Sequence, residues 1–314
     1  MRKEKERLTM IATVLLRTMA AAAMAACLAV HAEDRMKIVA TSFPIYDWTR
    51  QVIGETPHRF DLEFLQKNGT DLHSYQPTSI DLVKVARCDL FVCIGGESDE
   101  WAKRALVQKD NPRRRTLNLL KALGPAVKTE DDHDEDHCPD EHIWLSLRNA
   151  AKLSAAIAEE LAALDPANAA SYRRNATCYR AKLEQLDRAY ADTVAKSPHK
   201  TLLVADRFPF RYLADDYGLA YFAAFPGCSA ESEASFKTIA FLARKADALE
   251  LPAILALESS NGKLAETVRN ATKRHDQRIL TLDSLQSVDA AHAKTATYLD
   301  IMTRNLTTLK SALN

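Results

Sequence analysis

Residues 165–198, DPANAASYRRNATCYRAKLEQLDRAYADTVAKSP, decide the architecture of this chain. Asp165 followed by Pro166 is typical of a helix N-cap with proline at the first helical position, and Ser197 with a second proline ends the helical spacing. A helix of about 30 residues, at 1.5 Å per residue, is roughly 45 Å long. That length is enough to run down the side of two lobes, so the sequence predicts a connecting helix over residues 165–196.

The chain before this helix alternates short apolar runs with longer amphipathic ones. Strands are expected at residues 37–41, 60–65 and 89–94, and helices at residues 45–53, 80–86 and 148–164. This order makes βαβ units and a parallel sheet, in which ligands collect outside the carboxyl ends of the strands. Residues 33–164 are therefore expected to form an N-terminal α/β lobe.

Two histidines in this first lobe carry the chemistry. His73 lies in DLHSYQPT (71–78) and His142 lies in DEHIW (140–144), so each stands in a loop close to carboxylates. Neutral imidazole is the commonest protein ligand for zinc and its neighbours in the first transition row. We expect His73 and His142 to form one wall of a metal site.

The second half of the chain, residues 197–314, repeats the alternation and is expected to form a second α/β lobe. Strands are expected at residues 201–205, 220–225, 253–257 and 279–282, and helices at residues 210–217, 236–249, 264–275 and 295–312. The strand ends carry polar residues, namely Asp206, Arg207, Cys228, Glu258 and Asp283. We expect these residues to form a polar surface that faces the two histidines. This arrangement predicts a site between the lobes.

Length and composition agree with two lobes and argue against some functions. With 314 residues and 47% hydrophobic content, the chain can build two sizeable cores. The formal net charge is zero, and no basic stripe indicates a nucleic-acid partner. Nothing in the sequence indicates assembly, and we expect a monomer.

Residues 1–32 are expected to be a signal peptide and are left out of the fold. A basic start precedes an alanine-rich apolar run, and Val30-His31-Ala32 offers a small-residue cleavage site. The apolar stretch of about 13 residues is too short to span a bilayer. Lipoprotein processing at Cys27 is the alternative, although the residues before it lack the usual leucine. We expect an exported protein, periplasmic or on the cell surface.

Five cysteines follow the signal region, and an odd number in an oxidising compartment leaves at least one thiol free or bound to something else. Cys88 and Cys93 flank one predicted strand and point to opposite faces, so we expect no disulfide between them. Burial as small apolar side chains is expected for these two and for Cys178.

The segment 126–141 is dense in Asp, Glu and His and has no apolar periodicity. We expect a solvated loop, because such a composition cannot pack a core. The alternative is that His133, His137 and Cys138 form a weak auxiliary metal-binding site, which raises the ion concentration near the main site.

Six motifs in order make the chain resemble the cluster A-I solute-binding proteins of zinc and manganese ABC transporters, from Met36 to the last helix. The motifs are HSYQPTSID (73–81), GGESDEW (95–101), HIWLSL (142–147), DPAN (165–168), YLADDYGL (212–219) and LDSL (282–285). The resemblance implies two α/β lobes bridged by one rigid helix, with a metal ion held between them and delivered to a membrane permease. The acidic loop before the second histidine resembles the variable loop of the zinc branch.

The resemblance also implies ligands at His73, His142 and Asp283, and it fails at one position. Relatives commonly carry a histidine or glutamate where this chain has Arg207, and a guanidinium offers no lone pair. Cys228 is the first replacement, because a thiolate suits zinc, and Glu258 is the second. Arg207 is expected instead to pair with Asp283 or Glu258 and hold that carboxylate in place.

The function expected from these features is capture of Zn(II) without catalysis. Two histidines and a thiolate favour zinc over manganese, and Mn(II) or Fe(II) is the alternative if the site consists of two histidines and two carboxylates. A zinc hydrolase is disfavoured, because residues 137–142 match neither common zinc-protease motif and Pro139 opposes the helix that those motifs need. The resemblance also extends to surface adhesins built on the same scaffold, so adhesion remains an alternative.

Overall fold

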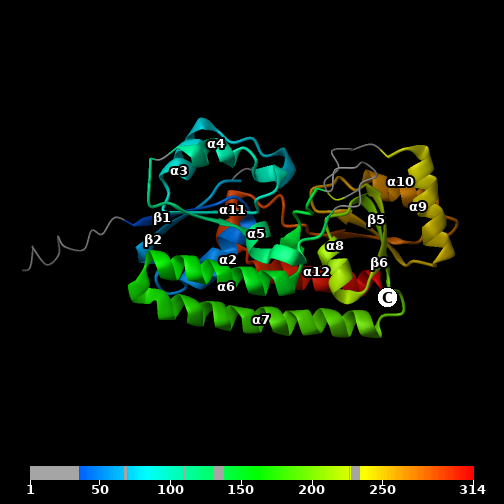
Figure 1. Cartoon of the computed structure of the whole chain (residues 1–314). Helices are drawn as coiled ribbons and strands as arrows, with labels where there is room; N and C mark the ends of the chain where they lie inside the picture. The colour runs from blue at the N-terminus through cyan, green and yellow to red at the C-terminus, as the bar shows by residue number, and fades with distance from the viewer. Residues whose placement is uncertain (1–34, 67–68, 109, 130–137, 226, 228–233) are drawn as a thin grey trace, which may run out of the picture.

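The computed structural model describes residues 35–66, 69–108, 110–129, 138–225, 227 and 234–314 (Figure 1). The predicted signal segment, Cys27, Cys228, His133 and His137 lie outside these residues. The described chain forms two α/β lobes, each built on a parallel sheet of four strands.

Both sheets have the same strand order. The first sheet runs β2-β1-β3-β4, with β1 Met36–Ala40, β2 Phe60–Phe64, β3 Leu90–Cys93 and β4 Arg115–Asn118. The second runs β6-β5-β7-β8, with β5 Thr201–Arg207, β6 Ala220–Phe225, β7 Ala253–Leu257 and β8 Arg278–Leu282. Because all the paired strands are parallel, their carboxyl ends lie along one edge of each sheet. The fold class predicted from the alternation of elements is confirmed.

Helices cover both sheets. In the first lobe they are α2 Phe43–Ile53, α3 Ser79–Arg87, α4 Ala102–Val107, α5 Leu119–Leu123 and α6 Leu147–Leu164. Those after the connecting helix are α8 Arg211–Tyr217, α9 Phe236–Ala248, α10 Lys263–Asn270, α11 Ala290–Thr295 and α12 Tyr298–Ala312. None of the helices in the described part of the chain is long and apolar enough to cross a membrane.

Two predicted helices have other bounds in the structure. The helix expected at residues 264–275 stops at Asn270, and His275 has a φ of 57°, a left-handed conformation that cannot continue a right-handed helix. The helix expected at residues 295–312 begins later, at Tyr298, because Thr297 is extended and caps it by accepting a hydrogen bond from the Asp300 amide, and the separate helix α11 precedes it.

The connecting helix α7, Ala169–Lys196, has 28 residues and is therefore about 42 Å long. It runs beside α6 and along both lobes (Figure 1). It begins later than predicted, after a 3-10 turn at Pro166–Asn168, because Asp165 does not cap the helix backbone. The Asp165 carboxylate instead accepts from the Tyr172 hydroxyl at 2.7 Å, which ties α7 to the preceding turn.

The chain after β8 returns to the first lobe and joins the two halves. Tyr298, at the start of α12, packs edge-on against Trp48 of α2, with ring centroids 5.3 Å apart. The Arg50 guanidinium donates to the carbonyl oxygens of Ala293 and Lys294. Helix α11 and the start of α12 are thereby held against the first lobe.

Candidate metal centre

The structure brings His73 and His142 together, with their Nε2 atoms 3.1 Å apart. His73 lies on a 3-10 turn after β2, where the Asp71 side chain accepts a hydrogen bond from the His73 backbone amide at 3.0 Å. His142 precedes the 3-10 turn Ile143–Leu145 and is fully buried. The two loops therefore lie together, and the role of their histidines as metal ligands stays a prediction.

The other ring nitrogen of each histidine has a partner that orients the ring. The Nδ1 of His142 lies 2.9 Å from the Asp140 carboxylate, which also accepts from the His142 backbone amide. Since an ionised carboxylate only accepts, Nδ1 carries the proton and Nε2 keeps the lone pair. The Nδ1 of His73 lies 2.9 Å from the Ser98 hydroxyl, which can take either role. Such partners orient metal-binding histidines in known sites.

Electrostatics keep His73 in the form that binds a metal. Burial, and after it the positive charge that His142 can carry, lower the pKa of His73 to about 4, and Arg207 acts in the same direction. Neutral imidazole is therefore the form of His73 present near pH 7. Two nitrogens 3.1 Å apart can both lie about 2.0–2.1 Å from one zinc ion, with an N–Zn–N angle of roughly 100°.

Arg207, at the end of β5, reaches the first lobe rather than its own. Its Nη2 atom donates to the Asp71 carboxylate at 2.8 Å, and both side chains are largely buried. The predicted pairing of Arg207 with Asp283 or Glu258 is therefore wrong. Those two carboxylates are already engaged within their own lobe, whereas Asp71 faces the end of β5.

Glu258 follows β7 and is bound to the loop after β8. Its two oxygens accept from the backbone amide and the hydroxyl of Ser284, at 2.8 Å and 2.7 Å. Burial, and then repulsion from Asp283, raise the pKa of Glu258 to about 7. Asp283 accepts from the Leu285 amide at 2.9 Å, and burial raises its pKa as well. Both carboxylates thus shape the loop that follows β8.

Gln286 in this loop is a residue to which the sequence patterns do not point. Its Nε2 atom lies 3.1 Å from the Nε2 atom of His142, and the side chain is buried. The indole Nε1 of Trp144 donates to the carbonyl oxygen of Ser284 at 2.8 Å and fixes the loop across the lobes. The only sequence signal for Gln286 is its position three residues after Asp283, a predicted ligand.

The predicted ligand set is only partly described. Among the described residues, no three His, Cys, Asp or Glu side chains gather closely enough to hold a metal ion. Cys228 lies outside those residues, so the structure says nothing of its place. The described arrangement is a pair of imidazole nitrogens with the Gln286 amide beside them.

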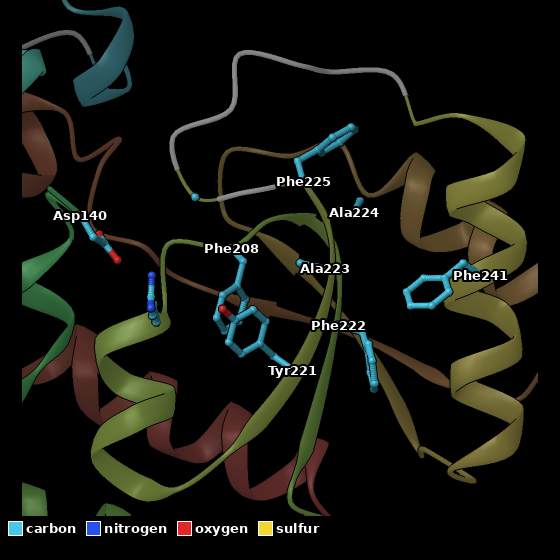
Figure 2. Close-up of a pocket in the computed structure, with 10 residues that line it drawn as sticks. Asp140, Phe208, Tyr221, Phe222, Ala223, Ala224, Phe225 and Phe241 are labelled. Carbon is cyan, nitrogen blue, oxygen red and sulfur yellow. The ribbon is translucent and has the colours of Figure 1, made fainter. Parts of the chain in front are cut away.

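A pocket of about 340 Å³ adjoins this centre on the second-lobe side (Figure 2). The Phe208 and Tyr221 rings stack there with their centroids 3.7 Å apart. The other lining residues come mainly from β6 and its neighbours and are Asp140, Arg211, Phe222, Ala223, Ala224, Phe225, Gly227 and Phe241. Asp140 therefore contacts both the pocket and the His142 ring.

The described cysteines are free thiols in different surroundings. Cys88 and Cys93 are buried, as predicted, and burial raises the pKa of both thiols, that of Cys88 to about 12. Cys178 is exposed on α7, so its predicted burial is wrong. Cys138 is half-buried and donates to the Glu97 carboxylate at 3.2 Å.

Comparison with known proteins gives one family over nearly the whole described chain. The model of the family ZnuA, described as zinc-uptake complex component A, periplasmic, matches residues 38–312. The zinc-binding lipoprotein AdcA of Streptococcus pneumoniae is 30% identical over 89% of this chain and 56% of its own length. The high-affinity zinc uptake system protein ZnuA of Bacillus subtilis is 28% identical over 89% of this chain and 88% of its own.

Solved structures agree with this result. The Zn(II)-bound ZnuA-like domain of Streptococcus pneumoniae AdcA superposes with a TM-score of 0.72 at 28% identity, covering 89% of this chain and 99% of that one. The chain spans about half the length of the full AdcA sequence that it matches. The family resemblance predicted from the six motifs is confirmed.

Proposed function

The chain belongs to the ZnuA family of periplasmic zinc-uptake components, and on that premise we propose that it captures Zn(II) and delivers it to an ABC-type permease. The observation that carries the proposal is the pair of Nε2 atoms of His73 and His142, 3.1 Å apart. Each ring is oriented through its other nitrogen, and the neutral form of each has a lone pair to give. No catalytic step is part of this role.

We propose His73 and His142 as the ligands from the first lobe. Asp283 and Cys228 are the remaining proposed ligands, and the described contacts of Asp283 leave one of its oxygens for this purpose. Imidazole nitrogens, with or without a thiolate, favour zinc. A centre completed by two carboxylates would favour Mn(II) or Fe(II) instead.

We propose a separate role for each part of the chain. Residues 1–32 direct export, residues 33–164 and 197–314 form the two lobes, and residues 165–196 connect them. The protein acts outside the cytoplasmic membrane as a monomer, either free or anchored through Cys27. The two lobes close on the ion, and the closed form is the one that the permease recognises.

Deletion of the gene, followed by complementation in zinc-depleted medium, tests the proposed function. Uptake of radioactive zinc should fall in the deletion strain and return with the wild-type gene, but not with a His73→Ala/His142→Ala gene. A matching assay with radioactive manganese identifies the metal. Zinc uptake that is unchanged by the deletion at limiting zinc contradicts the proposal.

A further inference from the structure

We infer that the outer edge of strand β6 is a docking site for an extended segment of another polypeptide. This segment adds one strand to the second sheet and carries β-branched and acidic residues in alternation. In the part of the chain that the structure describes, β6 lies at the edge of its sheet and pairs only with β5. Neither β6 nor α9 supplies a proposed zinc ligand, so this role is separate from zinc capture.

The pocket of about 340 Å³ follows β6 along this edge (Figure 2). Its lining includes every residue from Tyr221 to Phe225. Successive side chains of a strand point to opposite faces of the sheet, so a pocket that all of them contact lies beside the strand rather than over one face. A peptide that adds a strand binds at such an edge through main-chain hydrogen bonds.

The equivalent edge strand of the first lobe, β2, is built differently. The two strands hold the same place in the strand orders of their sheets. β2 carries Asp61 and Glu63, and charged side chains on an edge strand oppose pairing with another chain. β6 has the sequence AYFAAF and carries no charge. The second sheet therefore lacks at its edge the protection that the first sheet has.

Exposed apolar side chains concentrate on β6 and on α9, the helix beside it. Seven large apolar side chains are exposed in the described part of the chain. Four of these come from β6, from α9 or from the residue that follows α9, namely Tyr221, Phe236, Phe241 and Leu249. Exposed apolar side chains gathered on neighbouring elements are typical of interaction sites.

Both faces of β6 present an aromatic ring to an added strand. On one face the Tyr221 ring stacks on Phe208, with centroids 3.7 Å apart. On the other face Phe222 packs edge-on against Phe241 of α9, with centroids 5.8 Å apart (Figure 2). Tyr221 and Phe241 are each 38% exposed. Because aromatic rings pair well with β-branched side chains across strands, such side chains fit the face of Tyr221.

Helix α9 adds positive charge beside the face of Phe222. The Lys245 ammonium lies 4.4 Å from the centroid of the Phe222 ring, a cation–π contact. Lys237 and Arg244 stand four residues before and three residues after Phe241, so they share its side of the helix. None of these three cations forms an ion pair within the described residues. Acidic side chains of the added strand therefore complement this face.

Fluorescence anisotropy of the full chain with a labelled six-residue peptide of alternating valine and glutamate, as long as β6, tests the inference. We expect this peptide to bind about tenfold more tightly than a peptide of alternating valine and lysine. Lys245→Glu should weaken binding of the acidic peptide about tenfold, because the new carboxylate repels its glutamates. Lys294→Glu is the matched control, because Lys294 lines the pocket beside β2, and its affinity should stay within about twofold of wild type.

Hydrogen exchange locates the bound peptide. The backbone amides of residues 220–225 should exchange more slowly in its presence, and those of β2 should not change. Equal binding of the two peptides, or protection of β2 instead of β6, overturns the inference. Protection of β6 that rises with protein concentration in the absence of peptide would place a second copy of this chain at the edge, and it also contradicts the inference.

Discussion

The guanidinium of Arg207 in the second lobe donates to the carboxylate of Asp71 in the first lobe over 2.8 Å. The same carboxylate caps the turn that carries His73, so one residue connects the lobe contact to the metal centre. Arg207 thus supports, from the second lobe, the turn that carries His73 in the first lobe.

A double-mutant cycle measures the energetic coupling between Arg207 and Asp71. Arg207→Ala and Asp71→Ala should show a coupling of about 1 kcal/mol in the free energy of unfolding, since the pair is partly shielded from solvent. The exposed pair Arg274 and Asp276 is the control and should show a smaller coupling, because water surrounds both side chains. Equal coupling in the two pairs contradicts the assignment.

The carboxylate behind His142 should control zinc affinity. Asp140→Asn removes the acceptor that fixes the His142 tautomer, and a loss of about 10–100-fold in affinity is expected. Asp289→Asn is the control, because Asp289 binds the Nδ1 atom of the exposed His292 in the same way. Titration calorimetry with zinc measures both variants. Equal affinities in Asp140→Asn and wild type would show that the orientation of His142 does not matter.

Two of the three tryptophans of the first lobe, Trp144 and Trp101, should respond differently to truncation. Trp144→Phe leaves the carbonyl oxygen of Ser284 without its indole donor and should cost about 1–3 kcal/mol beyond the loss of volume. The Trp101 indole nitrogen has no partner among the described residues, so Trp101→Phe loses no such bond. Chemical denaturation of the two variants gives the difference, and equal costs would refute this role of Trp144.

Stability should depend on pH through Asp99. Burial, and then repulsion from Glu141, raise the pKa of Asp99 to about 7. Between about pH 4 and pH 7 the folded chain holds a proton that the unfolded chain has released, so the free energy of unfolding falls as pH rises. The limit of this contribution is about 4 kcal/mol.

Urea denaturation of wild type and Asp99→Asn from pH 5 to pH 8 measures this contribution. The variant should show a flatter dependence, because the titrating group is gone. Asp165→Asn is the control: burial opposes ionisation of Asp165, but hydrogen bonds from Tyr172 and Asn168 lower its pKa below the usual value, so Asp165 stays ionised throughout this range and its variant should keep the pH dependence of wild type. Parallel pH curves for Asp99→Asn and wild type would contradict the prediction.

Much of the fold follows from hydrophobic periodicity. The strands of the second lobe lie where short apolar runs predict them, and the two central strands, β5 and β7, are buried along most of their length. Strand β4, Arg115–Asn118, has no such apolar run, since Leu117 alone among its four residues is buried. It is recognised only by its pairing with β3.

The candidate metal centre also contains residues that the sequence predicts and residues that it does not. His73 and His142 follow from residue chemistry and from the strand edges to which their loops attach. Gln286 and the partner of Arg207 could not be predicted, because an amide and a guanidinium are common surface groups. Their contacts depend on the path of the loop after β8 and on the approach of the two lobes, which no local pattern contains.

Metal content of the purified full-length protein, measured by mass spectrometry, tests most directly whether His73 and His142 hold the ion together. We predict one zinc ion per chain in wild type and in the control His292→Ala, whose side chain is 78% exposed. We predict none in the His73→Ala/His142→Ala double variant. A full equivalent of zinc retained by that folded double variant would contradict a shared ion at these two histidines.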